Sequence, residues 1–184
     1  QIATGDLPDI FTVGADLLDL LHRSGKAMDL APHVSSDSHW NNVYPKGTLQ
    51  SNMMNGQLTN LPYELFVTPV TYNKKLLKAA GYDEFPDNYD DFFKMCEAVT
   101  ATGKACTSQM TAKNAWTSML WFSQALASAG GSDIYEKGLD DPAWVKAFEV
   151  MEKMYQYTTT DAIGADAGVS GGHFLNERTA VFMN

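Results

Sequence analysis

Residues 61–81 read LPYELFVTPVTYNKKLLKAAG, and this stretch decides the predicted architecture. Its middle part, residues 66–72, is apolar and rich in β-branched side chains, which predicts a strand. Pro69 interrupts this run. Because proline donates no backbone hydrogen bond, the segment is expected at a sheet edge, at a bulge or where the chain crosses between two parts of the molecule. Asn73 then predicts the N-cap of a short helix over 74–80, which the following glycine ends.

Upstream of this stretch, a strand and two helices are expected. Residues 9–13 (DIFTV) form a short apolar run typical of a buried parallel strand, and Gly14 breaks it. Leucines at helical spacing over 16–25 predict an amphipathic helix. Residues 30–48 are rich in Pro, Ser, Asp and Asn, which predicts irregular surface, and 48–55 are expected to form a further short helix.

Downstream, the chain is predicted to be mainly helical. Asn88 is an N-cap followed by acidic residues, and further helices are expected to open at Asn114 and at Pro142. Short strands are expected over 105–108 and 179–183. Strands alternating with helices predict an α/β fold, in which each strand needs neighbours in a sheet.

The composition is that of a globular chain and excludes several partners. The chain has 184 residues, of which 45% are hydrophobic and 19% are charged, and its formal net charge is -9. This acidic balance argues against binding to nucleic acid or to an anionic membrane surface. No apolar run approaches the ~20 residues that a membrane-spanning helix needs, so this segment is expected not to insert into a membrane. No signal peptide opens the chain, so in an exported protein that segment is expected to be removed or to lie outside this sequence.

Cysteine and histidine give weak signals. Cys96 and Cys106 form either one bridge in an oxidising compartment or two small buried apolar side chains, and the second interpretation is favoured. The four histidines lack the spacing of zinc ligands, and Asp161 and Asp166 lack that of a calcium loop. No metal site and no cofactor is therefore expected.

Four blocks of sequence point to a family when they are taken in order. The blocks are residues 5–11, residues 61–64 with 71–81, residues 86–92 and residues 174–180. Together they resemble the extracellular solute-binding proteins of ABC importers, the family that includes maltose- and other sugar-binding proteins. Asn88 stands where the family usually has threonine, and Glu177 and Val181 depart from the pattern of the last block. The resemblance covers nearly the whole chain but less than half of a typical member, so the chain is expected to be an internal piece.

The resemblance implies a fold and a function. The fold is α/β, periplasmic-binding-protein-like (type II), with two α/β lobes that close over a ligand. Residues 1–68 are expected to be part of the first, N-terminal lobe and 69–184 part of the second, with the hinge crossing near 66–72. The implied protein is not an enzyme but the extracytoplasmic solute-binding component of an ABC importer, held in the periplasm or as a lipoprotein on the cell surface.

The implied ligand is a carbohydrate, bound in the cleft between the lobes and delivered to the permease subunits of the transporter. The same fold binding glycerol phosphate or a polyamine is the nearest alternative. A neutral sugar is favoured over an anion because the chain is acidic, although local charge can differ from net charge.

Candidate ligand contacts follow the predicted strands, because ligands of open α/β sheets bind beyond the carboxyl ends of strands. Gly14, Ala15 and Asp16 follow the first strand, where the carboxylate of Asp16 either accepts hydrogen bonds from sugar hydroxyls or caps the next helix. Tyr63 and Glu64 combine an aromatic face with a carboxylate, which suits a sugar. The alternative for this pair is a core tyrosine beside a solvated glutamate.

Two tryptophans are candidates for stacking on a ligand. Trp116 lies in the first turn of the predicted helix that begins at Asn114, where a cleft is expected. Trp121 lies deeper in the same helix, and an aromatic side chain at helical spacing is commonly a core residue.

A hydrolase is the alternative from a different class of function. Residues 168–172 (GVSGG) match a nucleophile elbow with Ser170 as the nucleophile. An elbow needs a strand before it and a helix after it, whereas residues 158–172 are predicted to be a loop. His173 is also too close along the chain to form a triad with Ser170, so the hydrolase is disfavoured.

Overall fold

The computed structural model describes residues 4–64, 66–112 and 115–184, except for the side chains of Ala15, Asp16 and Asn41. The chain divides into two compact units, Gln1–Phe66 (unit 1) and Val67–Asn184 (unit 2). The division falls two residues before the predicted lobe boundary of 68/69, and the assignment of the units to two lobes stays a prediction.

Unit 1 is built from short helices. Over its described residues these are α1 (Ala15–Arg23), α2 (Ala31–Ser36), α3 (Ser38–Val43) and α4 (Thr48–Ser51). The helix predicted over 16–25 is confirmed as α1, and α4 covers the first half of the helix predicted over 48–55. The buried apolar side chains described in this unit are those of Leu21, Val34 and Leu58.

Two predictions for unit 1 are wrong. The run 9–13 is not a strand, and Ile10 is 92% exposed, because a strand needs a hydrogen-bonded neighbour and the described residues of unit 1 contain no strand to pair with. The segment 30–48 is largely helical rather than irregular. Its proline and one of its aspartates favour helix starts: Pro32 lies in the first turn of α2, and the Asp37 carboxylate caps α3 by accepting the His39 N–H at 2.8 Å.

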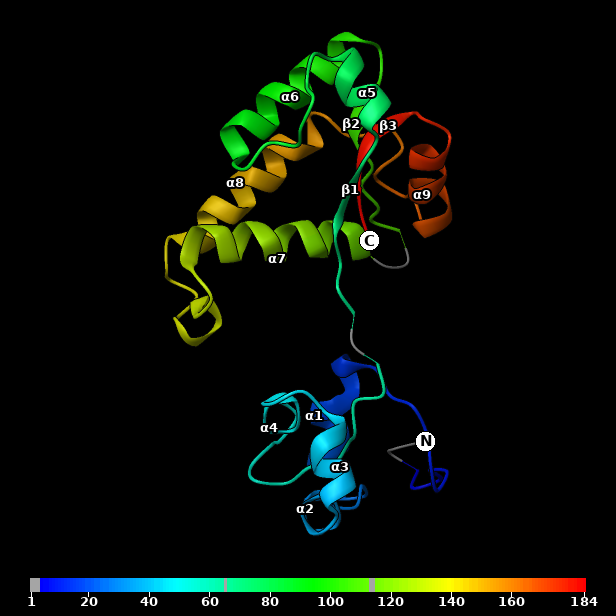
Figure 1. Ribbon diagram of the computed structural model, residues 1–184, viewed down its shortest axis with the longest axis vertical. Helices are drawn as coiled ribbons and strands as arrows, with labels where there is room; N and C mark the ends of the chain where they lie inside the picture. The colour runs from blue at the N-terminus through cyan, green and yellow to red at the C-terminus, as the bar shows by residue number, and fades with distance from the viewer. Residues whose placement is uncertain (1–3, 65, 113–114) are drawn as a thin grey trace. The chain divides into compact units, whose positions relative to one another are not determined.

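Unit 2 is a small mixed sheet covered by helices (Figure 1). Its described strands are β1 (Val70–Tyr72), β2 (Ala105–Thr107) and β3 (Thr179–Met183), in the order β1-β3-β2. β1 is antiparallel to β3, with Thr71 opposite Phe182, and β2 is parallel to β3. Pro69 directly precedes β1, which is an edge strand, as expected of a residue that cannot donate to a ladder.

The helices of unit 2 pack on both faces of this sheet. They are α5 (Lys74–Ala79), α6 (Tyr89–Ala101), α7 (Trp116–Gly130), α8 (Ala143–Tyr155) and α9 (Ala167–Leu175), with a 3₁₀ turn, η1, at Ile134–Glu136. In Figure 1, α6 and α8 lie on one side of the sheet and α9 on the other. The ring of Phe182 in β3 stacks on that of Phe174 in α9, whereas its neighbours Val181 and Met183 join the main core.

Asparagine caps begin two of these helices, as predicted. The side-chain oxygen of Asn73 accepts hydrogen bonds from the N–H groups of Lys75 and Leu76 at 3.0 and 3.1 Å. That of Asn88 accepts the Asp91 N–H at 2.9 Å. Each cap satisfies backbone donors that have no partner inside the helix. Both helices therefore begin directly after the predicted asparagine.

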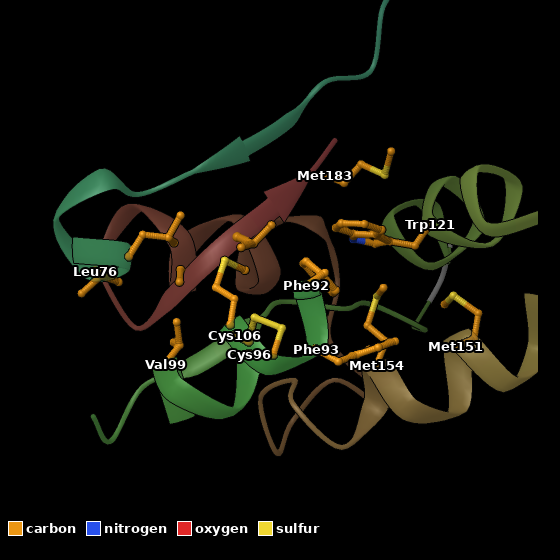
Figure 2. Close-up of a cluster of buried hydrophobic side chains, with 14 residues drawn as sticks. Leu76, Phe92, Phe93, Cys96, Val99, Cys106, Trp121, Met151, Met154 and Met183 are labelled. Carbon is orange, nitrogen blue, oxygen red and sulfur yellow. A yellow bond between two sulfur atoms is a disulfide. The ribbon is translucent and has the colours of Figure 1, made fainter. Parts of the chain in front are cut away.

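A cluster of buried side chains forms the main core of unit 2 (Figure 2). Phe92 and Phe93 of α6 meet Trp121 of α7 and Met154 of α8 in this cluster. Aromatic contacts connect Phe92 to Phe93 and to Trp121, with the ring centroids of Phe92 and Trp121 5.5 Å apart. The core therefore joins elements that are far apart in the sequence.

Cys96 and Cys106 form a disulfide bond inside this core, so the favoured interpretation of two unbonded cysteines is wrong. The bond joins α6 to β2, and the two Cα atoms are 4.9 Å apart, within the range that a disulfide allows. Figure 2 shows the bond between the two sulfur atoms among the apolar side chains. Pairing depends on how α6 folds back along β2, which the spacing of the cysteines does not reveal.

Candidate functional site

Three of the residues predicted to contact a ligand line one cavity of unit 1. The cavity has a volume of about 1240 Å³, and Gly14, Tyr63 and Glu64 lie in its wall. Its wall mixes apolar side chains with polar ones, and the polar ones are Asp9, Thr12, Lys26, Thr59, Asn60, Tyr63 and Glu64. Such a wall can cover an apolar surface and exchange hydrogen bonds with polar groups at the same time, which suits a small polar organic molecule.

Gly14 stands at the beginning of α1. Its backbone is extended, with φ -71° and ψ 155°, and its carbonyl accepts the N–H of Leu17 at 3.0 Å. The cap position therefore belongs to Gly14, and Asp16 lies in the first turn of the helix. The side chains of Ala15 and Asp16 lie outside the described part of the chain, so their predicted ligand contacts remain predictions.

The segment that leads to Tyr63 and Glu64 is anchored by Asp29. One oxygen of the Asp29 carboxylate accepts hydrogen bonds from the N–H groups of Leu58 and Ala31, each at 3.0 Å. These two bonds, that of Leu58 first, hold the pKa of the Asp29 carboxyl group below its ordinary value. The ionised carboxylate thus ties residue 29, which lies between the wall residues Met28 and Leu30, to Leu58, which directly precedes the wall residue Thr59.

Tyr63 and Glu64 present their side chains to solvent. The Tyr63 side chain is 78% exposed, so it is not the core tyrosine that the alternative interpretation required. Glu64, next to it, is also exposed. Tyr63 offers an aromatic face for an apolar C–H surface, and Glu64 offers oxygens that accept hydrogen bonds from hydroxyl groups.

Sequence reasoning missed five polar residues of this wall, which are Asp9, Thr12, Lys26, Thr59 and Asn60. Asn60 lies three residues before Tyr63, and its side-chain N–H₂ donates to the side-chain oxygen of Asn52 at 3.0 Å. Its closeness to Tyr63 along the chain was the one available signal. Lys26 follows α1 and has no motif around it, so only the folded chain brings it to the wall.

Trp116 is the first residue of α7 and is 47% exposed. Asn114, the predicted start of this helix, lies outside the described residues. Met119, one turn after Trp116 on the same side of the helix, is 56% exposed. Trp116 therefore keeps a large part of its ring free for contact with another molecule.

Trp121 lies in the core of unit 2 and is only 3% exposed. Its ring packs on that of Phe92, as Figure 2 shows. A tryptophan with so little accessible surface offers no face to a sugar. The structure therefore favours the packing alternative, and Trp121 is left out of the proposed site.

A shallow apolar depression runs between α7 and α8. Its volume is about 360 Å³, and its lining residues are Ser118, Met119, Phe122, Ser123, Phe148 and Met151. The hydroxyl of Ser118 is within hydrogen-bond distance of Gln109 Oε1 (3.0 Å) and of the Tyr155 hydroxyl (2.8 Å). These contacts use the hydroxyl group inside the protein, which leaves a mainly apolar surface.

Ser170 is buried and cannot act as a nucleophile toward a bound substrate. It lies inside α9, so the loop predicted over 158–172 is wrong for its last six residues. The cause is Asp166, whose carboxylate caps the helix by accepting the Val169 N–H at 3.0 Å. The hydroxyls of Ser170 and Ser108 each donate to the backbone carbonyl of the other, at 3.0 and 2.8 Å.

His173 has a partner other than Ser170. Its Nε2 lies 2.8 Å from a carboxylate oxygen of Asp161. No cluster of three or more His, Cys, Asp or Glu side chains that could hold a metal ion occurs within the described ranges. None of the helices described in the chain is long and apolar enough to span a membrane.

The fold is that of solved binding proteins. It matches a chitin oligosaccharide binding protein with a TM-score of 0.85 and 20% identity, over 100% of this chain and 47% of that one. It matches a sugar transporter from Arthrobacter chlorophenolicus A6 with bound laminaribiose equally well, at 14% identity over 100% and 48% of the two chains. These likenesses confirm the predicted α/β, periplasmic-binding-protein-like fold class.

Sequence relatives agree with the fold. An uncharacterized ABC transporter extracellular-binding protein of Pyrococcus horikoshii is 28% identical over 169 residues, which cover 85% of this chain and 37% of that protein. The chain thus spans less than half the length of these relatives. The family model described as bacterial extracellular solute-binding protein matches residues 1–184, and members of this family bind solutes and are not enzymes. The chain belongs to the family of bacterial extracellular solute-binding proteins.

Proposed function

We propose that this protein is the solute-binding component of an ABC importer, that it works outside the cytoplasm and that its solute is a carbohydrate. The observation that carries the proposal is the exposed pair Tyr63 and Glu64 in the wall of one cavity. A sugar ring has an apolar C–H face and a rim of hydroxyl groups, and an aromatic ring beside a carboxylate matches both. The names of the two solved relatives, which mention chitin oligosaccharide and laminaribiose, support a sugar as the ligand.

Trp116 adds a second aromatic surface to the proposal. Its half-exposed ring stands at the first turn of α7, next to the exposed side chain of Met119. A flat aromatic ring is a good partner for the apolar face of a pyranose. The cleft between two lobes, expected from the family resemblance, stays a prediction.

A ligand screen tests the class of solute. The complete protein, as its host makes it, is mixed with chito-oligosaccharides, laminaribiose, maltose, spermidine and glycerol 3-phosphate, and its melting temperature is recorded. A solute that binds only the folded protein raises this temperature by mass action. We expect a rise with one of the sugars. A rise with spermidine or glycerol 3-phosphate and with no sugar would replace the carbohydrate by the corresponding alternative.

Substitution of Trp116 tests its role. Trp116→Ala is expected to weaken sugar binding by more than tenfold, on the order of ~1.4 kcal/mol, as measured by calorimetry. Trp40→Ala is the matched control, because Trp40 is 40% exposed, close to the 47% of Trp116, and is not a candidate ligand contact. Unchanged affinity in Trp116→Ala removes this residue from the site.

Glu64→Gln separates a sugar from a cation. The substitution keeps the shape and the hydrogen-bonding oxygen but removes the charge. A neutral sugar is expected to lose little affinity, since a single rearranged hydrogen bond is worth about 1 kcal/mol, whereas a polyamine that pairs with the carboxylate loses more. Delivery of the solute to the permease is tested by solute uptake in cells from which the gene of this protein has been deleted and into which the wild-type or a variant gene has been reintroduced.

A further inference from the structure

The disulfide of unit 2 is enclosed on all sides. Cys96 and Cys106 are each 0% exposed, and both belong to the core cluster that also contains Phe92, Val99 and Val181. Figure 2 shows the two sulfur atoms among the apolar side chains of this cluster, with Phe92 and Val99 among those labelled. In the folded protein the bond is therefore out of contact with water and with anything dissolved in it.

Burial controls when this bond can form or break. Thiol–disulfide exchange requires a thiolate to approach one sulfur atom directly, and the closed core leaves no such approach. The bond must consequently form while α6 and β2 are still open to solvent, and reduction must wait until they open again. If the core closed before oxidation, the same side chains would surround two thiols and would keep an oxidant away from them.

We propose that the Cys96–Cys106 disulfide is an oxidation-dependent lock, made before the core of unit 2 closes and required for its full stability. The oxidant is a dithiol–disulfide exchange partner in its disulfide form, a protein or a small molecule. One cysteine thiolate attacks the donor disulfide, which gives a mixed disulfide and releases one donor thiolate. The second cysteine thiolate then attacks the mixed disulfide at the cysteine sulfur and releases the second donor thiolate. The two cysteine protons end on the released donor thiolates, so two cysteines are oxidised and one donor disulfide is reduced.

This lock places the maturation of the protein in an oxidising compartment, because reducing compartments keep thiols reduced. The disulfide proposal rests on the burial of the bond and involves no ligand, so its test is independent of the carbohydrate proposal. Unit 2 acquires a covalent connection between α6 and the edge strand β2 that a chain folded in a reducing compartment would lack.

Thiol labelling tests whether the lock is closed. The complete protein, purified from an oxidising compartment, is treated with dithiothreitol and then iodoacetamide, with and without denaturing guanidinium, and its mass is measured. We expect no label on Cys96 and Cys106 in the native protein and one label on each after denaturation. Labelling of both in native buffer at the denatured rate, or free thiols before any reductant is added, would overturn the proposal.

Thermal unfolding tests whether the lock stabilises the fold. Wild type that has been unfolded, reduced and refolded under reductant is compared with the oxidised protein and with the double variant Cys96→Ala/Cys106→Ala. We expect both the reduced protein and the variant to melt about 10 °C below the oxidised protein, and only the wild type to respond to reductant. Equal melting temperatures for oxidised and reduced wild type would show that the bond is dispensable. The reduced wild type keeps both side chains, so a loss in the variant alone would be a packing effect and would also contradict the lock.

Discussion

Unit 1 and unit 2 hold their elements together in different ways. In unit 2, strands from both ends of the unit exchange backbone hydrogen bonds, and helices cover them around a continuous apolar cluster that a disulfide crosses. In unit 1, the described helices are short, and Leu17 and Leu20 on the predicted apolar face of α1 are 43% and 53% exposed. Helix-start signals thus suffice for local helices, but a core requires partners from distant parts of the chain.

Truncation of one buried leucine in each unit is expected to give the largest difference in unfolding free energy between the units. Leu77 in unit 2 and Leu21 in unit 1 are 1% and 2% exposed, respectively. Leu77→Ala is expected to cost about 3 kcal/mol of unfolding free energy, because the surrounding cluster cannot collapse onto the gap. Leu21→Ala is expected to cost clearly less, because Leu21 lines the cavity of unit 1 and the wall of that cavity can relax. Hydrogen exchange resolved by unit, during urea unfolding, measures both, and equal losses would remove the contrast between the units.

The helix caps give a second, smaller comparison. Asn88→Ala removes the acceptor at the start of α6, a helix that contributes buried side chains to the core. This variant is expected to lose about 1 kcal/mol of unfolding free energy in unit 2. Asp37→Ala removes the equivalent acceptor at the start of α3 and is expected to fray that helix without changing the stability of unit 2.

Asn88→Ser is the control for this experiment, because serine retains a capping oxygen. Circular dichroism during thermal unfolding measures all three variants. A loss in Asn88→Ser as large as that in Asn88→Ala would show that something other than capping is responsible.

The hydrogen bond between Asp161 and His173 is expected to have the smallest effect. The hydrogen bond from His173 is the main cause that lowers the pKa of Asp161 from its ordinary value of 3.8. A lowered carboxyl pKa contributes stability that is fully present above the ordinary value and is lost as the pH falls through the lowered one. Because the Asp161 side chain is 47% exposed, solvent screens the pair and we expect less than about 1 kcal/mol.

Asp161→Asn tests this pH dependence. The melting temperature of the variant is expected to lie slightly below that of the wild type at neutral pH. The difference is expected to vanish as the pH falls through the lowered pKa of Asp161, where the wild-type carboxyl group becomes protonated as well. A difference that stays constant from neutral to acid pH would show that the charge of Asp161 is not the cause. Scanning calorimetry at a series of pH values is the measurement.

The fold was predictable where the signal is local. The asparagines at 73 and 88 mark helix starts because their oxygens bond to N–H groups only two or three residues away. The strands at 105–107 and 179–183 follow from β-branched and apolar composition. The same reasoning failed for 9–13, whose composition also favours a strand, because no neighbouring strand is present among the described residues of unit 1.

The candidate site was predictable in part for the same reason. Tyr63 and Glu64 are adjacent, so their pairing of an aromatic ring with a carboxylate is visible in the sequence. Trp116 and Trp121 are equally aromatic and lie on one helix, yet one is 47% exposed and the other 3%. That difference depends on which side of α7 meets Phe92, and no feature of the two residues themselves reveals it.

By itself, the sequence determined the family, the class of fold, most helix starts and the chemistry that Tyr63 and Glu64 offer. Only the tertiary structure decided that Cys96 is bonded to Cys106, that Trp121 is a core residue and that Lys26 joins the wall of the cavity. The physical reason is the separation along the sequence of the residues that make each contact. Caps and turns are made by backbone groups a few residues apart, whereas burial, sheet pairing and disulfide bonding are made by residues that only the complete packing brings into contact.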